Sequence, residues 1–107
     1  MIEKEFCIDL LKKTLEMKGQ ITLMVHGNSM LPTLLDNQAV IIQKTSNIKI
    51  GDIIAYYFFD ASEVKIIIHR VVFVRRTYVF TKGDNNNFID PIKISFNNIL
   101  GVINCEN

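Results

Sequence analysis

The chain has 107 residues, 49% of them hydrophobic and 21% charged, which is the size and composition of one ordinary globular domain. Twelve Lys and Arg against eleven Asp and Glu give a formal net charge of +1, and this balance excludes the clustered basic excess that nucleic-acid-binding domains usually carry. We therefore predict a single domain over residues 1–107 that folds without a metal or disulfide framework and has no nucleic-acid partner.

The N-terminal segment, residues 1–19, is predicted to form one amphipathic helix over residues 3–18. Apolar positions recur there at helical spacing between charged residues, and Gly19 stands where the end of a helix favours a left-handed residue. Such a helix docks on its own domain, on a partner or on a membrane surface, and docking on its own domain is the commonest case. The positions of its expected apolar face are Phe6, Leu10, Leu11, Thr14 and Leu15.

Residues 20–107 have the character of a β-rich core. Short runs of β-forming residues alternate with turn-forming segments, as in a domain built from short strands. The longest apolar runs are far shorter than the roughly 18 residues that a membrane-spanning helix needs. The predicted strands are Ile21 to Val25, Ala39 to Gln43, Asp52 to Phe59, Val64 to Val74, Tyr78 to Thr81 and Ile99 to Ile103.

Two ionisable residues, His69 and Arg70, interrupt the almost continuously apolar run 65–74. A run of this kind is typical of a strand covered on both faces. A buried ionisable group costs several kcal/mol unless it is paired or neutral. His69 is therefore either a satisfied structural histidine or a catalytic base at the edge of a site.

Ser29 follows directly on the first predicted strand, between Gly27 and Pro32. Gly27 permits an unusual backbone conformation, and Pro32 disfavours helix at Leu31, so the serine is expected on a fixed turn. A serine hydroxyl is a weak nucleophile until a neighbouring base removes its proton. Taken alone, Ser29 is better explained as a structural turn residue.

Four sequence blocks in a fixed order resemble the type I signal peptidases and the superfamily that they share with LexA-type self-cleaving repressors. The resemblance covers roughly residues 21–103 and implies a mainly antiparallel β fold with one N-terminal amphipathic helix. It also implies a serine endopeptidase that cleaves a leader or precursor peptide without a metal or organic cofactor. The blocks are Gly27-x-Ser29-Met30-x-Pro32-Thr33-Leu34, Gly51-Asp52-Ile53-Ile54, Ile68-His69-Arg70-Val71-Val72 and Thr81-Lys82-Gly83-Asp84-Asn85-Asn86.

Within this resemblance, Ser29 and His69 correspond to the nucleophile and base of the archaeal and endoplasmic-reticulum branch, where a histidine followed by arginine replaces the bacterial lysine. Lys65, the lysine of the same strand, falls four residues before the matching position. The same branch carries an acidic residue shortly after the Gly-Asp-Asn block. Asp90 stands at that distance and is assigned to orient the histidine, with Asp84 as the rival and a simple turn as the alternative explanation of either residue.

The remaining site assignments are weaker. The backbone N–H of Ser29 is the natural first oxyanion donor. Because Gly27 replaces the serine that many signal peptidases have two positions before the nucleophile, the second donor stays open between Asn28, a backbone amide near Gly27 and His26. A wall for the substrate is predicted at Met30, Leu31, Tyr56 and Phe58, although core packing explains each of these side chains equally well.

The sequence departs from signal peptidases in showing no membrane span. Its acidic N-terminus also lacks the apolar core of a secretory signal, so we expect a cytoplasmic protein that meets a membrane, if at all, through a partner. A soluble processing enzyme, a subunit recruited to membranes and a self-cleaving LexA-like regulator remain open; the last is weakest, since no Ala-Gly or Cys-Gly dipeptide occurs. A catalytically silent peptide-binding module is the alternative from another class.

Overall fold

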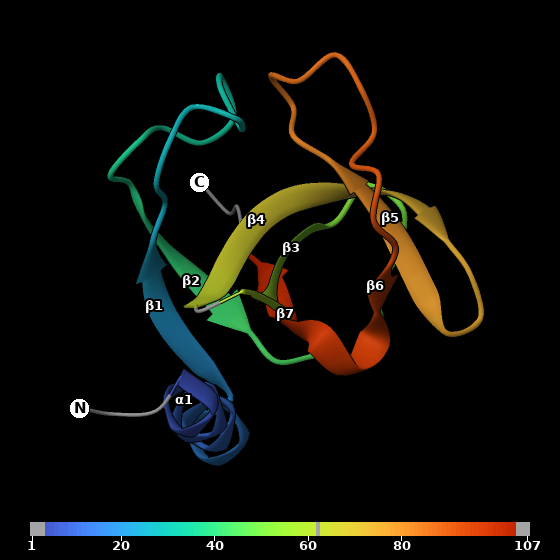
Figure 1. The fold of residues 1–107 in the computed structure, drawn as a ribbon. Helices are drawn as coiled ribbons and strands as arrows, with labels where there is room; N and C mark the ends of the chain where they lie inside the picture. Colours follow the sequence, from blue (N-terminus) through green and yellow to red (C-terminus); the bar gives the residue numbers. More distant parts are fainter. Residues whose placement is uncertain (1–3, 62, 105–107) are drawn as a thin grey trace.

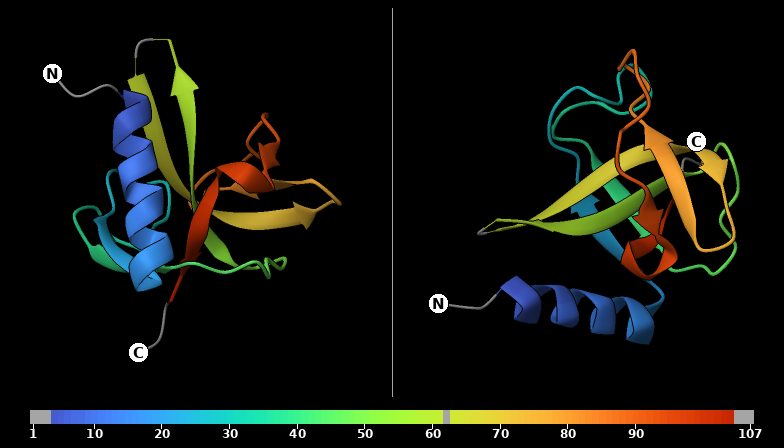
Figure 2. Two further views of the ribbon diagram at one scale, coloured as in Figure 1. Left: turned by 90° about the horizontal axis from the view of Figure 1, so that it is seen from below. Right: turned by 45° about the vertical axis from the view of Figure 1, so that its right-hand side comes forward.

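The computed structural model describes residues 4–61 and 63–104, and Figures 1 and 2 show their arrangement. One helix precedes seven strands, with a short 3-10 helix before the last. These elements are α1 (Lys4–Lys18), β1 (Gln20–Met24), β2 (Ala39–Gln43), β3 (Ile53–Asp60), β4 (Glu63–Val74), β5 (Tyr78–Lys82), β6 (Ile94–Ser95), η1 (Phe96–Asn98) and β7 (Ile99–Ile103).

Helix α1 packs on the strands of its own chain. Ile8 and Leu15 are buried on one face of the helix, and Leu11 packs beside them. Gly19 ends the helix with φ +79°, and its N–H donates to the carbonyl of Leu15 at 2.7 Å. Leu10 differs from the expectation, since it is 56% exposed; the buried stripe follows positions 8, 11 and 15, and Leu10 lies off it.

The seven strands form one antiparallel sheet in the order β1-β2-β7-β3-β4-β5-β6. This confirms the mainly β fold with one N-terminal helix, and each predicted strand is present with ends shifted by at most one residue. The sequence did not predict β6. It has two residues, too few to show any alternation of polar and apolar side chains.

The long strands β3 and β4 separate two apolar clusters. One contains the buried residues of α1 together with Val40, Ile42 and Leu100. The other contains Ile54, Tyr56, Val71, Val79 and Ile94. Because side chains alternate along a strand, β3 and β4 supply residues to both clusters, and their apolar character on both faces follows from this position.

Two loops meet at the end of the molecule opposite α1. Figure 1 shows the loop after β1, residues 25–38, beside the loop after β5, residues 83–93, and the right-hand view of Figure 2 agrees. The backbone N–H of Asn85 donates to the carbonyl of Ser29 at 2.8 Å, which joins the two loops directly. In the described part of the chain, no helix is both long and apolar enough to cross a membrane.

Candidate active site

Ser29 stands on a turn that is tied down on both sides. Gly27 takes φ +89°, a left-handed conformation that costs other residues about 1–2 kcal/mol. The N–H of Gly27 donates to the carboxylate of Asp36 at 2.8 Å. On the other side of the serine, Met30 is only 1% exposed and anchors the turn in the core. The side chain of Ser29 is therefore held at the surface by buried and hydrogen-bonded neighbours.

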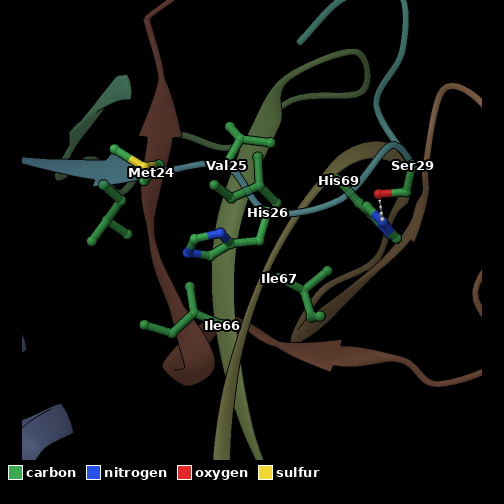
Figure 3. Close-up of a pocket in the computed structure, with 9 residues that line it drawn as sticks. Met24, Val25, His26, Ser29, Ile66, Ile67 and His69 are labelled. Carbon is green, nitrogen blue, oxygen red and sulfur yellow. Dashed lines mark hydrogen bonds between the residues drawn. The ribbon is translucent and has the colours of Figure 1, made fainter. Parts of the chain in front are cut away.

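Three side chains from distant parts of the chain form a continuous hydrogen-bonded series. Ser29 Oγ lies 3.0 Å from His69 Nε2, a contact drawn as a dashed line in Figure 3, and His69 Nδ1 lies 2.6 Å from Asp90 Oδ2. When Asp90 is ionised it can only accept, so Nδ1 carries the ring proton and Nε2 is left to accept from the serine hydroxyl. This tautomer is the one in which a histidine can take a proton from serine.

The side chains of His69 and Asp90 are partly buried and held in position by the strands. His69 lies in β4 opposite Ile54 of β3, and its side chain is 11% exposed. Asp90 is joined to β5 twice, because its N–H donates to the carbonyl of Thr81 at 2.8 Å and its carboxylate accepts from Thr81 Oγ1 at 2.7 Å. The aspartate is therefore fixed by strand β5 before it contacts the imidazole.

The hydroxyl of Thr81 also contacts a tyrosine beneath the site. Thr81 is fully buried, and its Oγ1 lies 3.3 Å from Tyr56 OH. Because the hydroxyl hydrogen of Thr81 is given to Asp90, the tyrosine is the donor in this second contact. Burial raises the pKa of Tyr56, and the nearby carboxylate of Asp90 acts in the same direction. Neither Tyr56 nor Thr81 was predicted to serve His69, although Thr81 opens the last of the four sequence blocks.

Asp84 binds a different partner from Asp90. Its two carboxylate oxygens accept from Arg70 Nε and Nη2, both at 2.8 Å, and Thr33 Oγ1 donates to it at 2.6 Å. The hydrogen bonds from Arg70 hold the pKa of Asp84 below its ordinary value, in spite of partial burial. Asp84 therefore ties the turn that carries Ser29 to strand β4. Of the two predicted carboxylates, Asp90 is the one in contact with His69.

The loop after β5 also approaches the turn through its backbone. A Cβ atom placed on Gly83 would lie 2.7 Å from the carbonyl oxygen of Ser29. Asn85 contributes its side chain as well, since Nδ2 donates to the carbonyl of Asn28 at 3.1 Å. Each residue of the Gly-Asp-Asn block therefore has a structural role. Gly83 lets the loop approach the Ser29 carbonyl, Asp84 pairs with Arg70, and Asn85 donates two hydrogen bonds to the turn.

A groove of about 240 Å³ leads to Ser29 and His69 between strands β1 and β4. Leu23 and Val25 lie on one wall, and Ile66 and Ile68 on the other. Figure 3 shows His26 projecting across the groove toward Ile66. Met30 and Leu31, predicted to contact a substrate, are not among the residues that line this groove. Met30 is instead part of the core, which explains its size and position.

Lys65 lies away from these groups. It pairs with Asp60 at 3.3 Å near the turn that joins β3 and β4. Four residues of strand separate it from His69, a distance of roughly 13 Å at about 3.3 Å per residue. Within residues 4–61 and 63–104, no group of three or more His, Cys, Asp or Glu side chains could hold a metal ion.

The family described as Peptidase S24-like matches residues 2–104. No curated protein and no solved structure matches the chain.

Proposed function

The chain belongs to the Peptidase S24-like family, and we propose that it is a serine endopeptidase of the signal peptidase type. Ser29 is the nucleophile, His69 the general base and Asp90 the group that orients the histidine. The observation that carries this proposal is the series of contacts Ser29 to His69 to Asp90, at 3.0 Å and 2.6 Å. A hydroxyl and an imidazole in direct contact are what serine activation requires.

The reaction that fits is acyl transfer to Ser29. As Oγ attacks the carbonyl carbon of a peptide bond, His69 Nε2 takes the hydroxyl proton, and Asp90 stabilises the imidazolium that forms. His69 then gives the proton to the leaving amine, and the carbon–nitrogen bond breaks. A water molecule, deprotonated by the same imidazole, hydrolyses the acyl ester and restores the serine.

The carbonyl oxygen that becomes negative needs donors in place. We assign the backbone N–H of Ser29 as the first of these and the side chain of Asn28 as the second. The N–H of Gly27 is already given to Asp36, which argues against it. Asn28 is exposed beside the nucleophile and is held by the hydrogen bond from Asn85 to its carbonyl. Loss of one oxyanion donor costs about 10²- to 10³-fold in rate.

The substrate proposed for this site is an extended peptide lying in the groove. Among the described strands, β1 pairs only with β2, and β4 pairs only with β3 over residues 63–69. Four antiparallel pairings connect β1 to β4, so the two strands run in the same direction. A peptide between them can therefore be parallel to both strands or antiparallel to both, and can hydrogen-bond to both unpaired edges by strand addition.

The geometry favours a histidine base over a Ser-Lys dyad, because Lys65 pairs with Asp60 at the far end of β4. This supports membership of the histidine branch of the superfamily. We further propose that the enzyme acts in the cytoplasm on a leader or precursor peptide. A recruiting partner accounts for any action at a membrane.

A peptide-library digest with the wild type, Ser29→Ala and His69→Ala side by side tests this function. The wild type is expected to cut a subset of peptides, and both variants to lose at least about 10³-fold in rate. Equal cleavage by all three proteins rejects the assignment. Binding without cleavage by wild type and Ser29→Ala alike identifies a peptide-binding module, and cleavage confined to the chain itself identifies a self-cleaving regulator.

A further inference from the structure

A second cavity, which takes no part in the proposed reaction, is also lined by His69. It has a volume of about 200 Å³ and is open to solvent on one side. His69, Asp90 and Tyr56 line part of it, and the rest of its wall is apolar. The apolar wall includes Phe58, Ile67, Pro91, Ile92 and Ile94.

The strand register explains why this cavity lies on the opposite face of β4 from Ile66 and Ile68 of the groove. Tyr56 pairs with Ile67 and Ile54 pairs with His69, so these four side chains share one face of β3 and β4. Ile68 points to the opposite face and packs on the cluster that contains α1. In Figure 3, Ile66 and Ile67 project to opposite sides of β4.

One apolar residue of the cavity wall is left largely uncovered by the fold. Ile92 is 61% exposed, and two other apolar residues of the same loop, Phe88 and Ile89, are 82% and 44% exposed. Exposed apolar residues close together are typical of binding sites. The cavity and the groove share two lining residues, Ile67 and His69.

We propose that this cavity is a second substrate subsite, which receives a large apolar side chain of the peptide that lies in the groove. The proposal rests on the proposed function. An extended peptide sends successive side chains to opposite faces of the sheet. Those on the α1 face meet Leu23, Ile66 and Ile68, and those on the His69 face meet Ile67 and the cavity beyond it.

The dimensions suit a side chain such as Leu, Met or Phe. An apolar cavity of about 150 Å³ is large enough to bind benzene, and this one is somewhat larger. The polar groups in the wall already have partners, because Asp90 contacts His69 and Thr81, and the hydroxyl of Tyr56 contacts Thr81. The subsite therefore selects against polar and charged side chains as well as against small ones.

The test begins with a peptide that the wild-type enzyme cleaves. Each of the four positions on either side of the cut is changed in turn to Leu and to Ala, and kcat/KM is measured for both peptides. The Leu to Ala ratio is expected to reach about tenfold or more at one position or at alternate positions. The alternation follows from the two faces of the sheet.

The enzyme variants are Ile92→Ser and Phe58→Ala, with Ile50→Ser as the matched control. Ile50 is 65% exposed and lines neither cavity. The first two variants are expected to lower the Leu to Ala ratio at least about threefold, because each removes part of the apolar wall that favours Leu over Ala. The control is expected to leave the ratio unchanged. The ratio compares two peptides on one preparation, so it does not depend on the folded fraction.

A ratio that stays at its wild-type value in both variants overturns the subsite, as does a fall in the ratio at adjacent positions or an apolar preference at no position. These results differ from failure of the proposed function. In that case the wild type cleaves no peptide, or Ser29→Ala cleaves as well as the wild type.

Discussion

Replacing Gly83 by alanine should disturb the turn that carries Ser29. The added Cβ would lie 2.7 Å from the carbonyl oxygen of Ser29, whereas ordinary contact begins at 3.4 Å. The difference, about 0.7 Å, has to be taken up by movement of one loop against the other. Asn86 Nδ2 is also close, at 2.6 Å, but it is the end of a side chain and can turn away. The serine carbonyl is backbone and cannot.

Two effects are expected from this movement. Overpacking costs about 1–3 kcal/mol, and in a domain of this size each kcal/mol lowers Tm by roughly 4–8 °C. The hydrogen bond from Asn85 N to the Ser29 carbonyl is stretched as well. Misplacement of a nucleophile by about 1 Å can lower its reaction rate by 10²-fold, so a fluorophosphonate probe should label Gly83→Ala about that much more slowly.

The assay compares labelling rates at a temperature where each protein is folded, with thermal unfolding followed by circular dichroism. Gly101→Ala is the matched control, since its Cβ would clash with the carbonyl of Gln43 at the β2 and β7 pairing, away from Ser29. It should lose stability but label at the wild-type rate per folded molecule. If folded Gly83→Ala labels as fast as the wild type, the steric argument for this contact is wrong.

Three further predictions concern the polar groups around the site. Thr81→Val should slow labelling of Ser29 about 10- to 100-fold, because Asp90 loses a charged hydrogen bond worth about 1.5–3 kcal/mol, whereas Thr81→Ser should stay near the wild-type rate; equal rates for both would contradict the role given to the hydroxyl. Asp84→Asn should lower the free energy of unfolding by about 1–2 kcal/mol near neutral pH. Because Arg70 lowers the folded-state pKa of Asp84, that difference is fully present above about pH 3.8 and lost as the pH falls through the lowered value; a difference unchanged in acid urea titrations would contradict it. Tyr56→Phe should lose less stability at alkaline pH than the wild type does. Because the pKa of Tyr56 is raised in the folded state, its contribution to the free energy of unfolding is complete below about pH 10.0 and is lost as the pH rises through the folded-state value. Identical alkaline unfolding curves for variant and wild type would refute this.

Most of the fold could be predicted because its signals are local. The strands are runs of β-forming residues bounded by turns, and α1 ends at a glycine in the left-handed conformation. Strand β6 escaped prediction because two residues carry no pattern. The strand order escaped it as well, since pairing such as that of β7 with both β2 and β3 joins segments far apart in the sequence.

Part of the candidate site could likewise be predicted from the sequence, and part could not. Resemblance in four short blocks brought Ser29, His69 and Asp90 forward, and these are the side chains that the structure places in contact. The sequence offers Asp84 as an alternative to Asp90, because sequence distance does not reveal which carboxylate reaches the imidazole. Its contacts with Arg70 and Thr33 depend on the meeting of three separate segments. Thr81 looks like an ordinary strand residue until its buried hydroxyl is seen against Asp90.

Activation of Ser29 by His69 can be measured by covalent labelling with a fluorophosphonate probe, with the adduct located by mass spectrometry. We expect a single adduct on Ser29 in the wild type and a rate about 10²- to 10⁴-fold lower in His69→Ala. Labelling of His69→Ala at the wild-type rate, or an adduct on another hydroxyl, would contradict it.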